Sequence, residues 1–361
     1  MVPWSVVKQV SLFLGMFLLG ALVLGMGIFC VRFWLFLSLP SAAQHRVETL
    51  EIKPGTDALS IGKLLEIQGV ITDAHQFFLW SWLRKSSHKL QAGEYAFPSS
   101  FTPVEVFDQL INGRVVEHRV TFPEGSTLRD VAKILAGSGL VSEDAFLQLA
   151  TSTEFIRSLG MNVSTLEGYL FPETYLFRKS QNPGSIIKTL VHQFWVHFPE
   201  EWTNRAREAG LTVHKTIILA SMVEKEAKVD YERPIIAAVF LNRLQHNMPL
   251  QCDPTTVYDL PGFTGPITPA ELKRQSPYNT YLNKGLPAGP ICNPGVKSIS
   301  AVLYPQKVSY LYFVSQNDGT HRFSQTLDEH HQAVADYYEK RKTMRLDDGS
   351  TSSSGNSKAV H

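Results

Sequence analysis

The sequence predicts an α+β protein that begins with one membrane-spanning helix, continues into a small repeated α/β region and ends in a larger α+β domain. Three observations support this prediction. Residues 9–31 contain no charged residue and are almost wholly apolar. Two later stretches, residues 55–73 and 125–143, align with each other without gaps. Beyond residue 161, apolar helical patterns alternate with long segments rich in Pro, Gly, Asn and Tyr.

The apolar N-terminal run is long enough to cross a bilayer. As a helix that rises about 1.5 Å per residue, residues 9–31 span roughly 33 Å, slightly more than a hydrocarbon core. A cleaved signal peptide is the alternative, with SAA before Gln44 as an acceptable cleavage site. However, the apolar region of a signal peptide is about 7–15 residues long, and this one continues past Arg32. We therefore expect residues 9–38 to be an uncleaved anchor and residues 39–48 a linker.

The two aligned stretches form an internal repeat. Each follows an alternating segment that indicates a strand, and each has an apolar 3.6-residue period, a glycine that suits a helix C-cap and an acidic start to a second helix. The predicted unit is strand–helix–helix. Two copies are too few for a solenoid, so the repeat is either a duplicated packing unit or a binding module for carbohydrate or a partner. The identical pairs include Lys63 and Lys133, Leu65 and Leu135, and Gly69 and Gly139.

The other expected elements follow from periodicity and turn residues. Residues 89–97 predict a strand, and residues 102–114 predict a helix with a capping box. The aromatic segment 166–175 predicts a structured loop or strand edge. Further along, we expect helices over 184–198, 214–228 and 233–245, a long irregular region over 247–300, a hairpin over 310–324, a helix over 328–342 and a disordered tail over 343–361.

Composition excludes several classes of function. The formal net charge of +1 is too small for the basic surface of a typical nucleic-acid-binding protein. Three cysteines, Cys30, Cys252 and Cys292, are too few for a disulfide framework. There is no CxxC or HExxH spacing for a metal, no glycine-rich phosphate loop and no GxSxG nucleophile motif. We therefore predict no cofactor and no metal.

Two carboxylates stand out in the segment ASMVEKEA, residues 220–227. On a helix, Glu224 shares a stripe with Ala220 and Ser221, whereas Glu226 points roughly the opposite way, so the two cannot face the same partner. The small neighbours of Glu224 leave room for a ligand, and partial desolvation there would raise its pKa toward the range used in acid–base catalysis. The alternative is a pair of surface glutamates at a helix end, paired with Lys225, Lys228 or Arg233.

Other carboxylates give weaker signals. They flank aromatic or Asn/Gln-rich loops, which commonly line sugar-binding sites, but each could equally be a turn or cap residue. These residues are Glu167, Glu173, Asp253 and Asp259.

Four segments together resemble the endolytic murein transglycosylase family of YceG-like proteins: residues 166–175, 220–259, 276–295 and 310–324. The order also matches, with an anchor, a small LysM-like region (here residues 49–118), the second repeat (119–160) leading into the catalytic domain, and a catalytic domain (161–342). The resemblance implies a single-pass plasma (inner) membrane protein with residues 1–8 in the cytoplasm and the catalytic domain outside. It implies internal cleavage of nascent peptidoglycan strands between N-acetylmuramic acid and N-acetylglucosamine, which leaves 1,6-anhydro ends and limits strand elongation.

The resemblance also implies roles for individual residues. The first glutamate of VEKE, Glu224, would be the catalytic acid and base, with Glu226 as the fallback. The residues expected to bind the glycan are Asn242, Arg243, Gln251, Asp253, Tyr278, Asn279, Thr280 and Tyr281, with Glu167 and Glu173 as further candidates. The implied partners are the peptidoglycan strand, the membrane and penicillin-binding synthases, without nucleic acid.

The sequence departs from the family pattern at two positions. Cys252 stands where threonine is usual, and Cys292 stands where alanine is usual. Because both motifs would converge on the groove, we consider a disulfide between these cysteines in an oxidising compartment. The departures leave the acid–base residues untouched.

Two other functions remain open at this point. A membrane-anchored wall-binding protein could use the repeat without any catalysis. A hydrolytic muramidase could use the same scaffold with a second carboxylate to activate water, and Asp253 is the candidate for that role.

Overall fold

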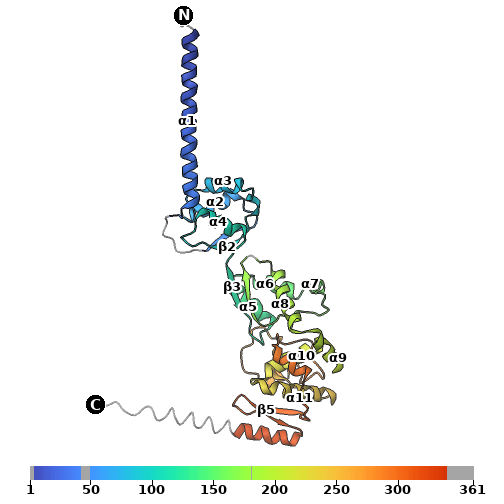
Figure 1. Cartoon of the computed structure of the whole chain (residues 1–361). Coiled ribbons are helices and arrows are strands. Elements are labelled where there is room, and N and C mark those ends of the chain that lie inside the picture. The colour runs from blue at the N-terminus through green and yellow to red at the C-terminus, as the bar shows by residue number, and fades with distance from the viewer. Residues whose placement is uncertain (1–3, 42–48, 180, 340–361) are drawn as a thin grey trace, which may run out of the picture. The chain divides into compact units, whose positions relative to one another are not determined.

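The computed structural model describes residues 4–41, 49–179 and 181–339, with side chains described from residue 12 onward. The chain divides into two compact units (Figure 1). The first comprises Met1–His118 and Leu176–Ser180, and the second comprises Arg119–Tyr175 and Gln181–His361. The predicted disordered tail, most of the predicted linker and the start of the N-terminal segment lie outside the described residues.

The first element is a long apolar helix, α1 (Trp4–Ser38). It is apolar around its whole circumference, and its side chains from Leu12 to Arg32 are exposed. The segment Leu12–Ser38 has a mean hydropathy of 2.4 over its most apolar window and is, within the described part of the chain, the one helix long and apolar enough to cross a membrane. A helix that is apolar on all sides requires either a protein core or lipid around it.

The first unit packs three further helices against a two-stranded sheet. Strands β1 and β2 are antiparallel, with Leu50 opposite Tyr95. The elements are β1 (Thr49–Ile52), α2 (Ala58–Ile67), α3 (Ala74–Leu83), the 3-10 turn η1 (Ser87–Lys89), β2 (Gly93–Ala96) and α4 (Pro103–Ile111). A capping box between Thr102 and Glu105 begins α4, as its sequence predicts.

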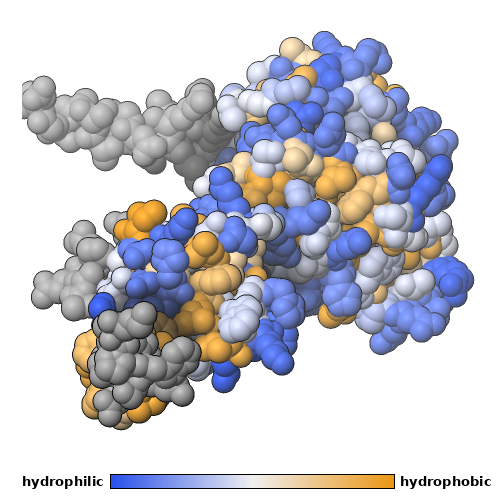
Figure 2. All heavy atoms as spheres, turned by 90° about the horizontal axis from the view of Figure 1, so that it is seen from above, coloured by the Kyte–Doolittle hydropathy of each residue, from blue (hydrophilic) through white to orange (hydrophobic). Residues whose placement is uncertain are grey.

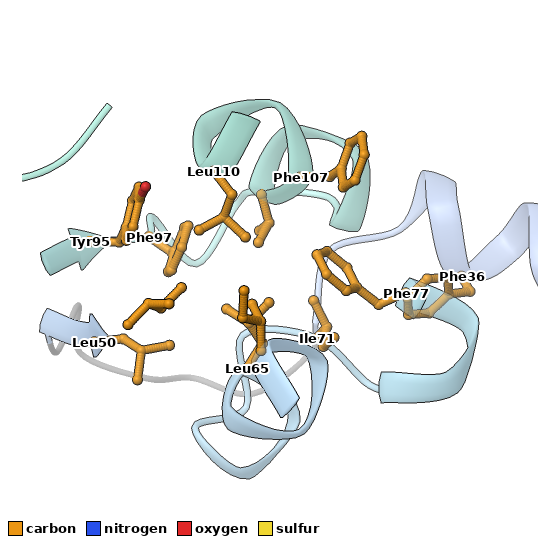
Figure 3. Close-up of a cluster of buried hydrophobic side chains, with 12 residues drawn as sticks. Phe36, Leu50, Leu65, Ile71, Phe77, Tyr95, Phe97, Phe107 and Leu110 are labelled. Carbon is orange, nitrogen blue, oxygen red and sulfur yellow. The ribbon is translucent and has the colours of Figure 1, made fainter. Parts of the chain in front are cut away.

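The core of this unit runs from the strands at one end to α1 and α3 at the other (Figure 3). Phe77 of α3 and Phe107 of α4 meet edge to face, with their ring centroids 5.9 Å apart. Tyr95 closes the strand end of the core. Phe36 of α1 also belongs to this core and is only 7% exposed. The last turns of α1 are therefore part of the folded unit.

The second unit begins with the second copy of the repeat. Its elements are β3 (Glu117–Thr121), α5 (Leu128–Gly137) and α6 (Glu143–Ala150), which follow the same order as β1, α2 and α3. Gly69 and Gly139 occupy equivalent places just after the first helix of each copy, with φ angles of +69° and +67°. This left-handed conformation suits glycine and ends the helix in both copies.

The second unit is mainly helical and contains most of the irregular chain. Its remaining elements are β4 (Thr174–Arg178, shared with the first unit and paired with β3), α7 (Thr153–Ser158), α8 (Pro183–His197), α9 (Glu200–Glu208), α10 (Val213–Glu226), η2 (Asp230–Glu232), α11 (Arg233–Gln245), η3 (Asp253–Thr256), α12 (Pro269–Leu272), α13 (Val296–Leu303), β5 (Tyr312–Ser315), β6 (His321–Ser324) and a helix over 327–339. The strands β5 and β6 form the predicted antiparallel hairpin.

Helix α10 lies at the centre of the second unit. Eight consecutive residues, from Thr216 to Val223, are buried, so the helix is enclosed on all sides. It packs on α11 and α13. Enclosure of this kind explains why its sequence lacks a clear polar face, and it delivers the two glutamates at its end, Glu224 and Glu226, into the interior of the unit.

We predict that Phe107→Ala destabilises the first unit by about 3–5 kcal/mol, because it removes a fully buried ring that touches both Phe77 and Trp80. Urea unfolding of the full chain in detergent measures the change. Ile67→Ala is the matched control, because Ile67 is 77% exposed and should alter stability by at most about 0.5 kcal/mol. Equal effects of the two substitutions would contradict this account of the core.

Candidate active site

Glu226 is the last residue of α10, and its carboxyl group is desolvated by the surrounding atoms. Burial raises the pKa of Glu226 from 4.5 to about 7, and the negative charge of Asp253 adds to the rise. Hydrogen bonds from the Cys252 thiol and from the backbone of Asp253 oppose the rise. The residue as a whole remains partly exposed, because the carboxyl lines a cavity.

This cavity has a volume of about 370 Å³. It lies where the end of α10 meets the loop before η3, the β5–β6 hairpin and the helix over 327–339. A space of this size accommodates a sugar unit, at the low end of the range for small-molecule pockets. The side chains that line it include Glu226, Arg243, Gln251, Asp253, Tyr281, Phe313, Ser315, His321, His330 and Tyr337.

Four of the predicted glycan-binding residues meet Glu226 at this cavity: Arg243, Gln251, Asp253 and Tyr281. Tyr281 donates a hydrogen bond to the Asp253 carboxylate. The buried Arg243 guanidinium donates to Gln251 Oε1 at 3.2 Å and to the Leu250 carbonyl at 2.9 Å. These bonds hold residues 249–251 against α11, so that Gln251 and Asp253 reach the cavity from a rigid loop.

Glu224 has a different environment. Its Oε1 accepts a hydrogen bond from Arg233 at 3.0 Å, and its Oε2 accepts one from the Gly295 backbone N–H at 3.0 Å. The side chain is only 6% exposed. Both oxygens are therefore used to join α10 to α11 and to the start of α13.

We expected open space beside Glu224, and in the structure its side chain and the small residues next to it are closely surrounded. Ser221 Oγ accepts a hydrogen bond from the Ile291 backbone N–H at 3.0 Å, so the loop before α13 fills the face that the small residues leave free. Ala220 and Ser221 are small because a backbone segment packs against them. The arrangement favours the fallback residue, Glu226, as the proton donor.

The other predicted binding residues hold the framework of the loops. Asn242 donates to the carbonyls of Val308 and Tyr310, at 2.9 and 3.0 Å. Asn279 is fully buried, with its amide donating to the Leu272 and Arg274 carbonyls. These two side chains provide hydrogen-bond partners for carbonyl groups of partly buried irregular chain. Neither lines the cavity.

Thr280 and Tyr278 also act within the framework. Thr280 Oγ1 accepts from the Cys252 backbone N–H at 3.0 Å, which places Cys252 beside Glu226. The ring of Tyr278 packs against that of Tyr258, with centroids 4.7 Å apart. Neither Thr280 nor Tyr278 lines the cavity.

Glu167 and Glu173 lie elsewhere. Glu167 is 2% exposed and accepts hydrogen bonds from the Leu128 N–H, at the start of α5, and from the Tyr258 hydroxyl, at 2.9 and 2.7 Å. Burial raises its pKa to about 7. Glu173 is exposed, and its contact with the preceding strand uses the backbone carbonyl, which accepts from Phe122. The remaining acidic candidate, Asp259, pairs with Arg274.

Two histidines at the cavity were not predicted to take part. His321 comes from β6, and its Nδ1 lies 2.7 Å from Glu232. His330 comes from the helix over 327–339, stacks on Tyr312 with centroids 5.1 Å apart, and has a buried Nδ1 without a hydrogen-bond partner among the described residues. The hairpin segment carries part of the family resemblance, but no local pattern shows that either imidazole faces Glu226.

The two buried cysteines, Cys252 and Cys292, are both free, so the disulfide considered above is absent from the structure. Cys252 contacts Glu226, whereas the Cys292 thiol donates to the Ser221 carbonyl at 3.3 Å. Burial raises the pKa of both thiols well above the ordinary value. No group of three His, Cys, Asp or Glu side chains within the described residues has the arrangement of a metal site.

Residues 50–336 match the model of the YceG-like family. The chain belongs to this family. A Bacillus subtilis relative named endolytic murein transglycosylase is 32% identical over 80% of this chain and 84% of its own length. A Streptococcus pneumoniae relative of the same name is 28% identical over 88% of this chain, but the match spans only 63% of that longer protein.

A solved structure agrees with the fold of this YceG-like chain. The crystal structure of a YceG-like protein from Listeria monocytogenes shares 32% sequence identity with it. The alignment covers 79% of this chain and 98% of the Listeria chain, with a TM-score of 0.56.

We predict that stability falls as the pH rises from about 4.5 to about 7. In this window the folded protein keeps protons on Glu226 and Glu167 that the unfolded chain releases, because burial raises both pKa values to about 7. Each group should contribute roughly 1–3 kcal/mol to the decline. Urea unfolding at a series of pH values measures it, and Glu226→Gln should flatten the curve. Parallel curves for the two proteins would contradict the raised pKa of Glu226.

Proposed function

We propose that this chain is a membrane-anchored lytic transglycosylase that cleaves peptidoglycan strands internally, between N-acetylmuramic acid and N-acetylglucosamine. The observation that carries the proposal is the environment of Glu226, a desolvated carboxyl group with a pKa of about 7 at the wall of a sugar-sized cavity. Membership of the YceG-like family, whose relatives carry the name endolytic murein transglycosylase, supports the same reaction.

In the proposed mechanism, Glu226 acts first as an acid and then as a base. The protonated carboxyl donates its proton to the glycosidic oxygen, and the bond between that oxygen and C1 of the muramic acid breaks through an oxocarbenium-like state. The 6-hydroxyl of the same sugar then attacks C1, and its proton passes to the Glu226 carboxylate. The product is a 1,6-anhydro end, and the enzyme returns to its protonated form. A pKa near neutrality suits both steps.

One carboxyl group is enough for this reaction because the substrate supplies its own nucleophile. Most glycosidases need a second carboxylate as nucleophile or as base for water. Here the 6-hydroxyl is held close to C1 within the same sugar, which gives the advantage of an intramolecular reaction. The negative charge of Asp253, which accepts a hydrogen bond from Tyr281, would stabilise the positive charge that develops on the sugar.

The neighbouring side chains would bind the glycan. Gln251 supplies an amide, Tyr281 a flat ring, and His330 a ring nitrogen that has no hydrogen-bond partner among the described residues, all at the cavity that contains Glu226. Arg243 would act through the loop that it holds, because its guanidinium already donates to Gln251 and to backbone carbonyls. We assign Glu224 to the framework, since Arg233 and Gly295 occupy both of its oxygens.

The anchor sets where the enzyme would act. We propose that α1 crosses the plasma (inner) membrane once, with the N-terminus in the cytoplasm and both units outside. The first unit would be a LysM-like module that binds glycan. Cleavage near the membrane surface would act on strands as they are made, which would limit their length and make penicillin-binding synthases natural partners.

A hydrolytic muramidase is the second candidate, and one observation favours it. Asp253 lines the same cavity as Glu226 and could activate a water molecule on the opposite face of the sugar. Hydrolysis would leave reducing ends, whereas the lytic reaction leaves anhydro ends, so the products separate the two mechanisms.

We predict that Glu226→Gln lowers the rate of glycan cleavage by roughly a hundredfold to ten-thousandfold, because the amide cannot exchange the proton. The full chain in detergent is incubated with purified murein glycan, and products are identified by mass spectrometry. The wild type should give anhydro-ended fragments. Reducing ends would establish the hydrolase, and no cleavage by a folded wild type would favour a binding protein.

Glu224→Gln is the matched comparison, since it changes a carboxyl group two residues away on the same helix. It should cost about 3–5 kcal/mol of stability by leaving Arg233 without its buried partner. The fraction that remains folded should cleave glycan at a rate close to that of the wild type. An inactive but folded Glu224→Gln variant beside an active Glu226→Gln variant would reverse the assignment.

We also predict that kcat/KM declines above about pH 7, by roughly tenfold per pH unit, because the first step requires the protonated form of Glu226. Measurement of initial cleavage rates between pH 5 and pH 9 tests this expectation. A rate that stays constant to pH 9 would be inconsistent with Glu226 as the acid.

A further inference from the structure

Helix α3 of the first unit has an exposed apolar edge that no other described element covers. We define this edge as Phe78, Trp82 and Leu83, which are 38%, 62% and 52% exposed. Phe77 and Ser81 of the same helix are fully buried, so α3 has one face in the core and another in solvent. A large exposed tryptophan beside other apolar side chains is a common sign of an interaction surface.

The edge lies on the side of the unit from which α1 leaves. The Trp80 ring of α3 packs against Phe33 of α1, with centroids 6.4 Å apart, and against Phe107 of α4. Figure 1 shows α3 at the end of the first unit that meets α1, with β2 at the other end. In Figure 2, where α1 is seen nearly end-on, hydrophobic residues lie beside it on the same face.

The sequence of α1 places this contact at the boundary of the hydrocarbon core. The uncharged run of α1 ends at Val31, and Arg32 is the first charged residue after it. Phe33, the residue that touches Trp80, comes directly after Arg32. Because Phe36 is also buried in the core of the unit, the unit cannot move along α1 or swing away from it without unpacking. If α1 spans a bilayer, α3 lies at the level of the lipid headgroups.

The charge around the edge fits a membrane surface. Residues 74–90 contain no Asp or Glu, and the edge is followed by Arg84, Lys85 and Lys89. The Arg84 guanidinium lies 5.4 Å from the centre of the Trp80 ring, which keeps a positive charge next to the aromatic side chains. Tryptophan favours the membrane interface, and each basic residue near an anionic surface contributes about 1 kcal/mol.

We propose that the edge formed by Phe78, Trp82 and Leu83 inserts into the headgroup region of the bilayer that α1 crosses. The proposal rests on the membrane anchorage suggested under the proposed function. Insertion would fix the first unit against the membrane surface with its strand end turned away from the lipid, instead of leaving it free on a tether. Glycan binding by this unit would then be confined to a layer next to the membrane.

The experiment places fluorescent probes at three positions of the full chain in lipid nanodiscs. Cys30, exposed on α1, reports the anchor in the wild type, while Cys252 and Cys292 are buried and stay unlabelled in the folded protein. The variants Trp82→Cys and Lys53→Cys, each with Cys30→Ser, report the edge and, just after β1, the opposite end of the unit. Each thiol carries an environment-sensitive dye, and quenching by spin-labelled lipids is measured.

The expected result is strong quenching at position 30 by lipids labelled in the upper part of the acyl chain, because Cys30 lies two residues before Arg32. At position 82, lipids labelled near the headgroup should quench several-fold more than at position 53, and anionic lipid should increase the difference. Leu83→Cys repeats the measurement if the Trp82 variant is unstable, because Leu83 is also exposed.

Three results would overturn the proposal. Equal, weak quenching at positions 82 and 53 with strong quenching at position 30 would mean that the anchor is real but the edge is not inserted. A dye at position 82 that is shielded from water but not quenched by lipid would mean that protein, such as a second copy of the chain, covers the edge. Absence of quenching at position 30 would instead refute the membrane anchorage, and the docking proposal with it.

Discussion

The burial of α10 is the constraint on which the second unit depends. A helix enclosed along Thr216–Val223 carries the charges at its end into the interior, and each buried charge needs a partner or a proton. The two glutamates meet this requirement in different ways. Glu224 pairs with Arg233 and with the Gly295 N–H, and so joins three segments of the chain. Glu226 has no cationic partner of this kind among the described residues, and burial raises its pKa. Glu224 thus joins the framework together, and Glu226, two residues further along the same helix, is the residue to which we assign the chemistry.

The long region between α11 and α13 stays ordered with little secondary structure because polar side chains bind its backbone. Asn279 donates to two carbonyls, Thr280 accepts from the Cys252 N–H, and Arg243 donates to the chain at Leu250. These bonds replace the ladder of a helix or sheet, so that backbone groups are satisfied although the chain is irregular. The same network sets the position of the groups around Glu226. Several residues that the sequence predicted to bind sugar therefore hold the backbone that positions the cavity-lining side chains.

The two copies of the repeat show how far local sequence determines structure. Both form a strand and two helices, and both end the first helix at a glycine with positive φ, because these features depend on residues a few positions apart. Their surroundings differ, since one copy packs with the end of α1 and the other belongs to the unit that contains the cavity. The first helix buries equivalent positions in both copies, so local similarity determines which face is buried but not which part of the chain covers it.

The sequence by itself determined the apolar span, the strand–helix–helix units, the main helices with their caps, the β5–β6 hairpin and the family. Periodicity, capping residues and turn residues act within a few positions along the chain, so these features can be read from local pattern. Only the tertiary structure decided which glutamate faces the cavity. Helical geometry predicted open space on the face of Glu224, and in the structure Ile291, seventy residues from Ser221, donates a hydrogen bond to Ser221 on that face. The cavity at Glu226 is built from Asp253, Tyr281 and the C-terminal helix, whose contacts with α10 leave no local signal in the sequence.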